Sequence, residues 1–209
     1  MKLFDMSGAP NPRRVRVFLA EKGIDIEKIQ IDIPSGENLK SDYLKINPRG
    51  VLPTLQLDDG TIIDDSSAIC RYFEATHPNP ALFGSTPKSK GLIESWVRQI
   101  EGDCFTPTMD VVRNTSPTFE NRSVPGTNNT PQIKALADRG TDRVLNFYSR
   151  LDKHLNEPVF LVGNSFSIAD ITAMCAIDFA EYVGIKVPSD LAKLSEWKER
   201  VSSRPSAQA

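Results

Sequence analysis

Two polar segments near the beginning of the chain have the residue types of helix starts that bind ligands. Asn11 is followed by Pro12, and asparagine before proline is typical of an N-cap and the first helical position. Asp65 and Ser66 likewise precede a helical pattern that runs to about Thr76. The free N–H groups and the positive dipole end of a helix N-terminus favour an anionic ligand group. Capping alone would also explain both segments, so capping and ligand binding stand as two compatible interpretations.

A third segment, Val51-Leu52-Pro53, begins a predicted strand that ends near Leu57. Proline has no N–H to donate, so the plainest interpretation is the first residue of an edge strand. A cis bond before Pro53 would instead leave the N–H and C=O of Leu52 free to pair with a peptide ligand. Taken alone, the segment favours the edge strand.

These segments lie in a stretch with a recognisable order of predicted elements. A strand over 2–6, a helix that ends at Gly23 and alternating isoleucines at 29, 31 and 33 form a β-α-β unit. Such a unit has a right-handed crossover and parallel strands. The elements predicted after it are a short helix over 42–46, strands over 53–57 and 61–63 around an Asp59-Gly60 turn, and a helix over 66–76. This order matches the thioredoxin-like fold.

The remainder of the chain is predicted to be helical. Residues 78–87 are rich in proline and indicate an interdomain linker. Residues 114–131 are rich in Asn, Thr, Pro and Ser and indicate a loop that could act as a lid. Helical patterns cover 88–112, 132–155, 168–183 and 191–203. We therefore predict an α/β thioredoxin-like N-terminal domain over 1–77, a linker over 78–87 and an all-α C-terminal helical domain over 88–209.

The composition argues against several classes of function. The 209 residues carry a formal net charge of −2, which favours neither a nucleic-acid surface nor a polybasic membrane patch. Cys70, Cys104 and Cys175 are widely spaced and the chain has two histidines, so we expect neither disulfides nor a metal site. Asp5 falls where a signal peptide needs apolar residues, and no apolar run is long enough to cross a bilayer. A cytoplasmic location is expected.

Four segments together resemble the soluble glutathione S-transferase superfamily over nearly the whole chain. Each is weak alone, but their order, with a proline-rich linker before the last, makes a specific pattern. The segments cover residues 7–15, 47–55, 65–69 and 166–170. The resemblance implies the glutathione transferase fold, with glutathione as co-substrate and no metal.

The resemblance also implies how the N-terminal domain would hold glutathione. Val51, Leu52 and Pro53 would form one part of the site, with the Leu52 backbone pairing with the cysteinyl backbone of the tripeptide. Lys40 is expected against the glycyl carboxylate, and Arg49 is a weaker candidate for the same role.

The γ-glutamyl end of glutathione is assigned to the start of the helix over 66–76. By resemblance, the hydroxyl and amide of Ser66 would hold the γ-glutamyl carboxylate, and Asp65 would pair with the ammonium group. The family usually has glutamate at the position of Asp65, which is one methylene shorter and could alter the reach. Ser66 could bind and cap at once.

The segment from Ser7 to Asn11 covers the place where family members activate the glutathione thiol. A thiol with an ordinary pKa of about 8.5 is mostly protonated at neutral pH, and hydrogen-bond donors near a helix N-terminus lower that pKa. The segment has no Cys or Tyr, which argues against members that attack through their own thiol. Ala9-Pro10-Asn11 resembles nu-class and yeast-prion-type members. Asn11 is therefore the first candidate donor and Ser7 the second, because Ala9 stands where Ser-Pro-Asn relatives have serine.

The implied activity is a glutathione transferase in which the glutathione thiolate attacks a hydrophobic electrophile. Two alternatives stay open: glutathione-dependent peroxide or disulfide reduction, and a non-catalytic binding or regulatory protein on the same fold. Family members are usually homodimers that serve detoxification, and Glu101 and Asp103 are placed to reach glutathione in a partner. Candidates for the electrophile pocket are Trp96, Met109, Val112, Arg113 and Phe119.

Two further groups of polar or charged residues are expected to have structural roles. At least two of Arg13, Arg14 and Arg16 are predicted to lie on a solvated helix face. Ser167 and Asp170 form a capping box, which should stabilise the helix that follows and take no part in catalysis.

Overall fold

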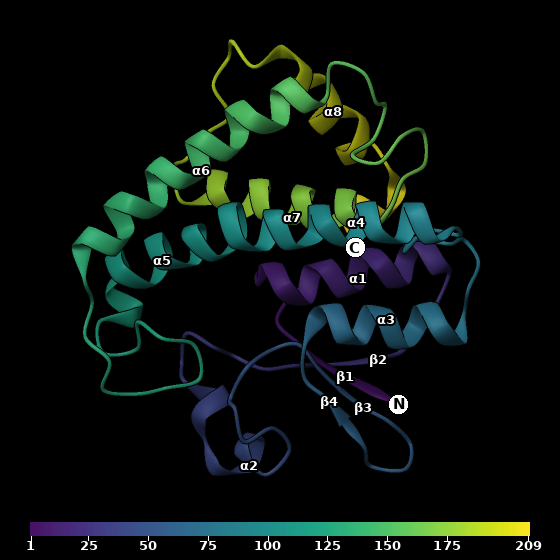
Figure 1. The fold of residues 1–209 in the computed structure, drawn as a ribbon. Helices are drawn as coiled ribbons and strands as arrows, with labels where there is room; N and C mark the ends of the chain where they lie inside the picture. Colours follow the sequence, from purple (N-terminus) through teal and green to yellow (C-terminus); the bar gives the residue numbers. More distant parts are fainter.

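The computed structural model describes residues 1–209. The N-terminal part of the chain contains a four-stranded mixed sheet (Figure 1). The strands are β1 (Lys2–Asp5), β2 (Glu27–Gln30), β3 (Thr54–Gln56) and β4 (Ile62–Ile63), in the spatial order β2-β1-β3-β4. β1 and β2 are parallel, whereas β3 runs antiparallel to both β1 and β4. Phe4 lies opposite Ile29 on one side and Thr54 on the other, which fixes the register. The sheet confirms the thioredoxin-like prediction.

The second strand is shorter than the isoleucine alternation predicts. β2 ends at Gln30, and the N–H of Ile31 makes a last bond to the carbonyl of Asp5. The pairing stops there because its partner β1 also ends at Asp5. Ile33 therefore lies in the segment between β2 and α2 and not in the sheet.

Helices cover the two faces of the sheet unequally. α1 (Pro10–Lys22) and α3 (Ser66–Thr76) lie between the sheet and the remaining helices, and the short α2 (Ser41–Leu44) lies on the opposite side (Figure 1). Because side chains alternate along a strand, Leu3 joins the main core with α1 and α3, whereas Phe4 joins a small cluster with Tyr43 and Leu52.

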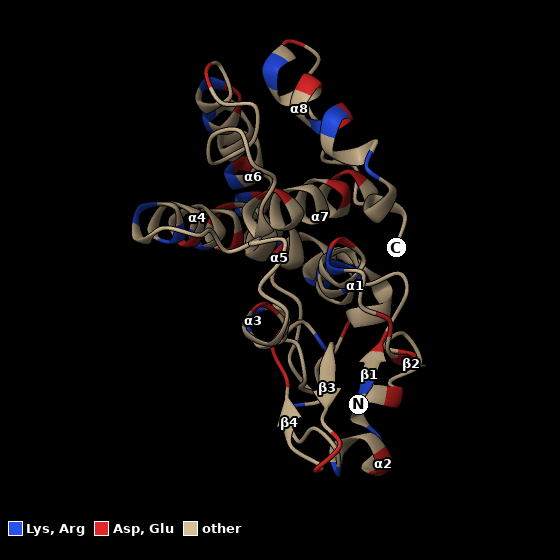
Figure 2. Ribbon diagram, turned by 90° about the vertical axis from the view of Figure 1, so that its right-hand side faces the viewer, with Lys and Arg blue, Asp and Glu red and all other residues tan.

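The second half of the chain is all helical, as predicted, with one interruption. α4 (Pro87–Ile100) and α5 (Thr106–Thr115) are joined by a π-helical segment over Glu101–Phe105, and α6 (Lys134–His154), α7 (Ile168–Tyr182) and α8 (Ala192–Ser202) follow. Short 3₁₀ turns cover Glu37–Leu39, Pro117–Phe119 and Pro205–Gln208. π-Helical segments such as Glu101–Phe105 often occur at functional sites. In Figure 2 these helices form the upper part of the molecule and the sheet the lower part.

One hydrophobic core runs through both halves of the molecule. It joins side chains of α1 and α3, such as Phe18 and Phe73, to those of the central helix α7 and to Trp197 of α8. Leu82 and Phe83, within the segment predicted as a linker, are also buried in this core. Continuous packing of this kind holds the helical half in place over the N-terminal end of α1.

The start of α7 confirms the predicted capping box. The Ser167 side chain accepts a bond from the first turn, and the Asp170 carboxylate accepts from the Ser167 N–H. None of the helices is both long and apolar enough to span a bilayer.

Candidate functional site

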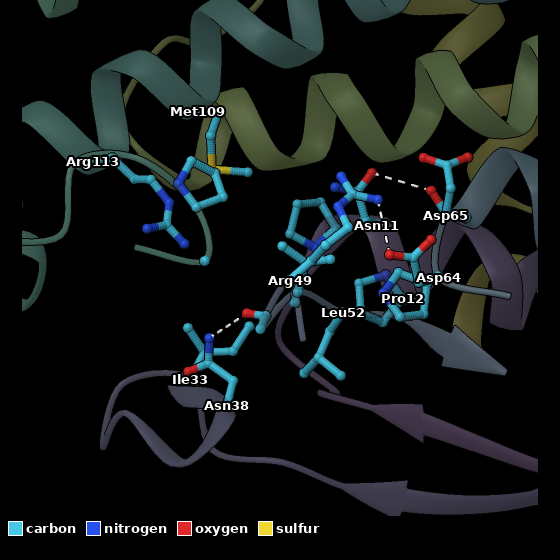
Figure 3. A pocket seen from close by; sticks show the side chains of 18 residues that line it. Asn11, Pro12, Ile33, Asn38, Arg49, Leu52, Asp64, Asp65, Met109 and Arg113 are labelled. Carbon is cyan, nitrogen blue, oxygen red and sulfur yellow. Dashed lines mark hydrogen bonds and ion pairs between the residues drawn. The ribbon is translucent and has the colours of Figure 1, made fainter. Parts of the chain in front are cut away.

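A cavity of about 220 Å³ lies where the N-terminal ends of α1 and α3 face α5 (Figure 3). Its walls come from five parts of the chain: the start of α1, the segment between β2 and α2, the turn before β3, the start of α3, and α5 with the loop that follows it. The lining residues include Asn11, Ile33, Asn38, Arg49, Val51, Leu52, Pro53, Asp64, Asp65, Ser66, Met109, Arg113, Pro125 and Gly126. The structure therefore gathers most of the predicted glutathione-binding residues around one hollow.

Asn11 lies two positions further into α1 than the sequence suggests. The N-cap of α1 is Ala9, Pro10 is the first helical residue, and Asn11 is the second, so the prediction of Asn11 as N-cap is wrong. Proline at the first position is favoured because its N–H would be unpaired there in any case. The Asn11 amide is not consumed by capping: its Oδ1 accepts a bond of 3.4 Å from Ser66 Oγ, and its amide nitrogen has no partner in the chain.

Ser7, the second candidate for the thiol contact, lies outside the cavity wall. It is exposed in the turn after β1, where its N–H donates to Gln30 and its carbonyl accepts from Arg16 at 2.8 Å. These two bonds tie the turn to β2 through Gln30 and to α1 through Arg16. Buried Ala9 forms the wall instead.

Two polar side chains at the start of α3 face the cavity, and they differ in their hydrogen bonds and in their exposure. Asp65 is the N-cap, and its Oδ1 accepts from the N–H groups of Ser67 and Ala68 at 2.8 and 3.0 Å. The other carboxylate oxygen makes no hydrogen bond in the chain and Asp65 is exposed at the cavity. Ser66, one residue into the helix, is 2% exposed and lines the same cavity.

Ser66 is held by an arginine that sequence reasoning missed. The Arg14 guanidinium donates to Ser66 Oγ through Nε at 3.2 Å and also through Nη2, and its Nη1 pairs with Glu101 at 2.6 Å. Arg98 binds the other oxygen of Glu101 at 2.8 Å. This chain of contacts ties α1 to α3 and to the π-helical segment, so it fixes the position of the Ser66 hydroxyl.

The prediction that at least two of the three arginines of α1 are solvated is wrong. Arg14 is 3% exposed and Arg16 9% exposed, and Arg16 pairs with buried Asp5 at 2.6 Å. Arg13 is partly covered and pairs with Asp178 at 2.7 Å. One signal was available: Asn11, Arg14 and Phe18 recur at i, i+3 and i+7, the spacing of a single buried helix face.

The turn before β3 has the backbone geometry expected of a peptide-binding edge. The bond from Leu52 to Pro53 is cis. The carbonyl of Val51 is occupied, because the Tyr43 hydroxyl donates to it at 2.7 Å and Asn47 at 3.1 Å. The N–H and C=O of Leu52 take no part in the hydrogen bonds of the chain. The backbone groups of Leu52 are therefore available to a ligand, as the resemblance implies.

Tyr43 supports this turn and does not act as an acid. It is 3% exposed and its hydroxyl lies 2.8 Å from Thr54 Oγ1. Burial raises the pKa of Tyr43 to about 12, so the hydroxyl keeps its proton at neutral pH.

The two basic candidates for the glycyl carboxylate occupy different places. Lys40 is exposed before α2 and borders a separate hollow with Tyr43 and Ile46, away from the main cavity. Arg49 does line the cavity, although its side chain is 66% exposed and its guanidinium pairs with Asp64 at 2.9 Å.

The loop over residues 116–133, predicted from sequence as a possible lid, forms part of the cavity wall. Arg122 donates to the carbonyl of Ile33 at 3.0 Å and to Asn38 Oδ1 at 3.4 Å, which ties the loop to the N-terminal half. Pro125 and Gly126 form part of the wall. Gly126 has φ 74°, and a Cβ there would lie 2.0 Å from the carbonyl oxygen of Arg49, so only glycine permits this close approach.

A second hollow of about 480 Å³ adjoins the first on the side of the helical half. Phe105, Met109 and Val124 give it apolar wall, while Arg14 and Glu101 border it. Asn11 and Met109 line both hollows, so the Asn11 amide lies at the boundary between them. Of the remaining predicted pocket residues, Trp96 stacks on His154 and Val112 lines neither hollow.

Glu101 and Asp103, predicted to reach a partner's glutathione, are both paired within this chain. Glu101 binds Arg14 and Arg98, as described above. Asp103 binds Arg143 at 3.3 Å and Arg150 at 2.6 Å.

The three cysteines lie in the core and not in the cavity. Burial raises the pKa of Cys70 and of Cys104 to about 12 and that of Cys175 to about 11, so all three are thiols at neutral pH. No group of three or more His, Cys, Asp or Glu side chains gathers in a way that could hold a metal ion.

Comparison with known proteins places the chain in a family. The model of the glutathione S-transferase N-terminal domain matches residues 9–76, and that of the C-terminal domain matches residues 109–205. Glutathione S-transferase 2 of Saccharomyces cerevisiae is 32% identical over 213 residues, covering 99% of this chain and 87% of that protein. The chain therefore belongs to the glutathione S-transferase superfamily and is a glutathione transferase.

Solved structures point to one branch of that superfamily. The crystal structure of Gtt2 from Saccharomyces cerevisiae superposes with a TM-score of 0.91 at 32% identity, covering 100% of this chain and 99% of that one. A Gtt2-class transferase of Vibrio parahaemolyticus gives 0.84 at 31% identity, covering 100% of this chain and 96% of that one. Among known transferases, the chain is thus similar to the yeast and bacterial Gtt2 class.

Proposed function

We propose that the main cavity binds glutathione in an extended form and that Asn11 stabilises its thiolate. The observation that carries the proposal is the position of the Asn11 amide, which has a free donor at the boundary between the two hollows. A thiol bound beside it would face the second hollow, where an electrophile can lie.

The ends of the tripeptide fit the polar groups of the wall. The unpaired oxygen of Asp65 suits the γ-glutamyl ammonium, and the start of α3 with the Ser66 hydroxyl suits its carboxylate. The free N–H and C=O of Leu52, between Val51 and Pro53, suit the cysteinyl backbone. Ser7 and Lys40 lie outside this wall and have no part in the scheme.

The chemistry is transfer of the glutathionyl group to a hydrophobic electrophile, with a new bond formed at the glutathione sulfur. The Asn11 amide and the N-terminal end of α1 favour the thiolate over the thiol, which lowers the thiol pKa toward neutral pH. The thiolate attacks an electrophile held against Phe105 and Met109, and the leaving group departs into the open second hollow. The asparagine donor is the feature shared with nu-class members.

We further propose a cytoplasmic homodimer that serves detoxification. The three buried, unpaired cysteines suit a reducing compartment, and Leu92 of α4 is a large apolar side chain that is 45% exposed. Light scattering on the purified protein tests the dimer directly.

A panel of aryl halides, hydroperoxides and mixed disulfides assayed with glutathione tests the proposed chemistry. Conjugation of aryl halides supports thiol transfer, whereas activity confined to peroxides or disulfides would replace it with a reductase. Asn11→Ala should lower kcat about 100-fold while changing the Kd of glutathione little, because the amide acts mainly on the thiolate. Asn156→Ala, in an exposed turn far from the cavity, is the matched control. Equal losses in kcat and affinity for Asn11→Ala would contradict thiolate stabilisation.

A further inference from the structure

Arg113 of α5 is a buried guanidinium with unused hydrogen-bonding capacity at the cavity. The residue is 7% exposed and lines the main cavity. Its Nη1 donates to the carbonyl of Arg122 at 2.7 Å, and its Nε is buried without a partner. The guanidinium lies over the ring of Phe119, 4.5 Å from the ring centroid. One edge of the fork is therefore fixed while the rest is free to bind a ligand.

No acidic side chain neutralises this charge. The charged group that acts on Arg113 is another arginine, Arg122, whose guanidinium lies 5.7 Å from the same Phe119 ring. Arg122 donates to backbone and amide oxygens and makes no ion pair. Burial and the charge of Arg122 lower the pKa of Arg113 to about 10, so it is still charged at neutral pH. A buried charge without a counter-charge is costly, which suits a site that an anion completes.

The two ends of the cavity differ in charge. Asp64 and Asp65 lie at the start of α3, beside Asn11, whereas Arg113 extends from α5 toward the end formed by Ile33 and Asn38 (Figure 3). An extended ligand that places an ammonium at the acidic end would therefore place its other end near Arg113. The charge pattern matches a peptide with a cation at one end and an anion at the other.

We propose that Arg113, oriented by Phe119 and by the carbonyl of Arg122, binds a carboxylate inside this cavity. This inference rests on the proposed function and extends it to a specificity-determining residue from the helical half. Two carboxylates could reach the site: that of the glycyl end of glutathione, and one carried by an acidic electrophile.

The direction of the peptide favours the glycyl carboxylate. A tripeptide held at Ser66 and at the Leu52 backbone continues along the wall toward Ile33 and Asn38, where Arg122 fastens the loop. Lys40, expected in that role from the resemblance, borders a different hollow. Arg113 would then couple peptide binding to the position of the loop over residues 116–133.

The experiment measures four ligands against three proteins. Wild type, Arg113→Met and Arg113→Lys are titrated calorimetrically with glutathione and with its glycine monoethyl ester, which lacks the glycyl charge. The same proteins are assayed at saturating glutathione with an aryl chloride and with its ring-carboxylate analogue. Arg113→Met should weaken glutathione about 10- to 100-fold and leave the ester unchanged, and Arg113→Lys should recover part of the loss.

The pattern of losses identifies the source of the carboxylate. If Arg113→Met weakens the binding of glutathione but not of its ester, the bound carboxylate is that of the glycyl end. If the variant raises only the KM of the acidic aryl chloride, the bound carboxylate is that of the electrophile. Equal losses for charged and uncharged ligands, or no loss for any ligand, overturn the inference. Thermal unfolding of each variant shows whether the fold survives, and the ratio between glutathione and ester is independent of how much protein is folded.

A control variant shows whether the effect is specific to Arg113 or follows from the loss of any arginine that lies over an aromatic ring. Arg71 also lies over a phenylalanine, 4.7 Å from the Phe83 ring centroid, but it borders a different hollow. Arg71→Met should leave all four ligands unaffected. If wild type neither binds nor turns over glutathione, the proposed function fails; if wild type is active and Arg113→Met behaves like wild type, only this inference fails.

Discussion

The starts of α3 and α7 carry similar capping residues and differ in what surrounds them. At α7, Ser167 and Asp170 are 1% and 0% exposed. The Asp170 carboxylate accepts from the N–H groups of Leu161 and Ser167 at 2.9 and 3.0 Å and from Trp197 Nε1 at 3.0 Å. Every group there is satisfied within the chain, so no capacity remains for a ligand.

At α3 the capping residues face a cavity and keep capacity to spare. Asp65 caps the helix with one carboxylate oxygen and leaves the other unpaired, and Ser66 is oriented by Arg14. Capping chemistry in a sequence therefore does not distinguish a structural helix start from a binding one. What distinguishes them is whether hydrogen-bonding groups remain free beside a hollow.

The largest expected effect is on stability and belongs to the α7 site. Asp170→Ala leaves the N–H groups of Leu161 and Ser167 and the indole of Trp197 buried without an acceptor. We expect the free energy of unfolding to fall by about 3–5 kcal/mol, measured by urea denaturation. The folded fraction should bind glutathione with unchanged Kd; a weaker Kd in folded protein would break the distinction between the two helix starts.

Ser66→Ala should show the opposite balance. Removing the hydroxyl takes one partner from the bound carboxylate and one from Arg14, so the Kd of glutathione should rise about 10-fold or more. The free energy of unfolding should fall by only about 1–2 kcal/mol, because Arg14 keeps its pair with Glu101. Calorimetric titration measures the first quantity. Unchanged glutathione affinity with a large loss of stability would make Ser66 a purely structural residue.

Asp65→Asn separates helix capping from ligand binding, because asparagine is as good an N-cap as aspartate. The stability should change by no more than a few tenths of a kcal/mol, while loss of the charge should weaken glutathione several-fold through its ammonium group. Asp65→Ala serves as the partner variant and should lose about 1 kcal/mol of stability as well. If asparagine binds glutathione as well as aspartate does, the ammonium contact is wrong.

The smallest expected effect concerns Glu21, a carboxylate of α1 that is used for structure alone. Burial raises its pKa, but bonds from Arg204 and Ser206 and the charge of Arg204 outweigh this and leave the pKa below its ordinary value. A lowered pKa gives stability that is present above the ordinary value near 4.5 and is lost as the pH falls through the folded-state pKa.

Denaturation of wild type and Glu21→Gln between pH 6 and pH 3 tests this sign. The wild-type advantage should shrink as the pH falls, with glutathione affinity at pH 7 equal in both proteins. An advantage that grows on acidification would show that the pKa is raised.

Much of the fold could be predicted because local signals agreed with the tertiary arrangement. Gly23 does end α1 in the left-handed conformation at φ 64°, and the helix over 66–76 has the predicted bounds. The Ser167 capping box begins α7 as expected. In each case a few neighbouring residues determine the local structure, so a sequence pattern is sufficient.

The candidate site was only partly predictable, because its geometry depends on contacts between distant segments. The cap of α1 moved to Ala9 because Pro10 already suits the first helical position, which freed Asn11. At least two of Arg13, Arg14 and Arg16 were expected on a solvated face, yet Arg14 is buried and holds Ser66. Lys40 is basic and near in sequence, but the chain between β2 and α2 directs it to another hollow.

Local residue patterns were sufficient for the order of elements and for the starts of α3 and α7. These follow from propensities and turn chemistry that act over a few residues. Three features depend on the tertiary arrangement: which capping groups face a cavity, the burial of Arg14, and the absence of an acidic partner for Arg113. Burial and charge pairing depend on which segments meet in space. Arg14 and Ser66 are separated by 52 positions along the chain, and Arg13 and Asp178 by 165, yet each pair is in contact.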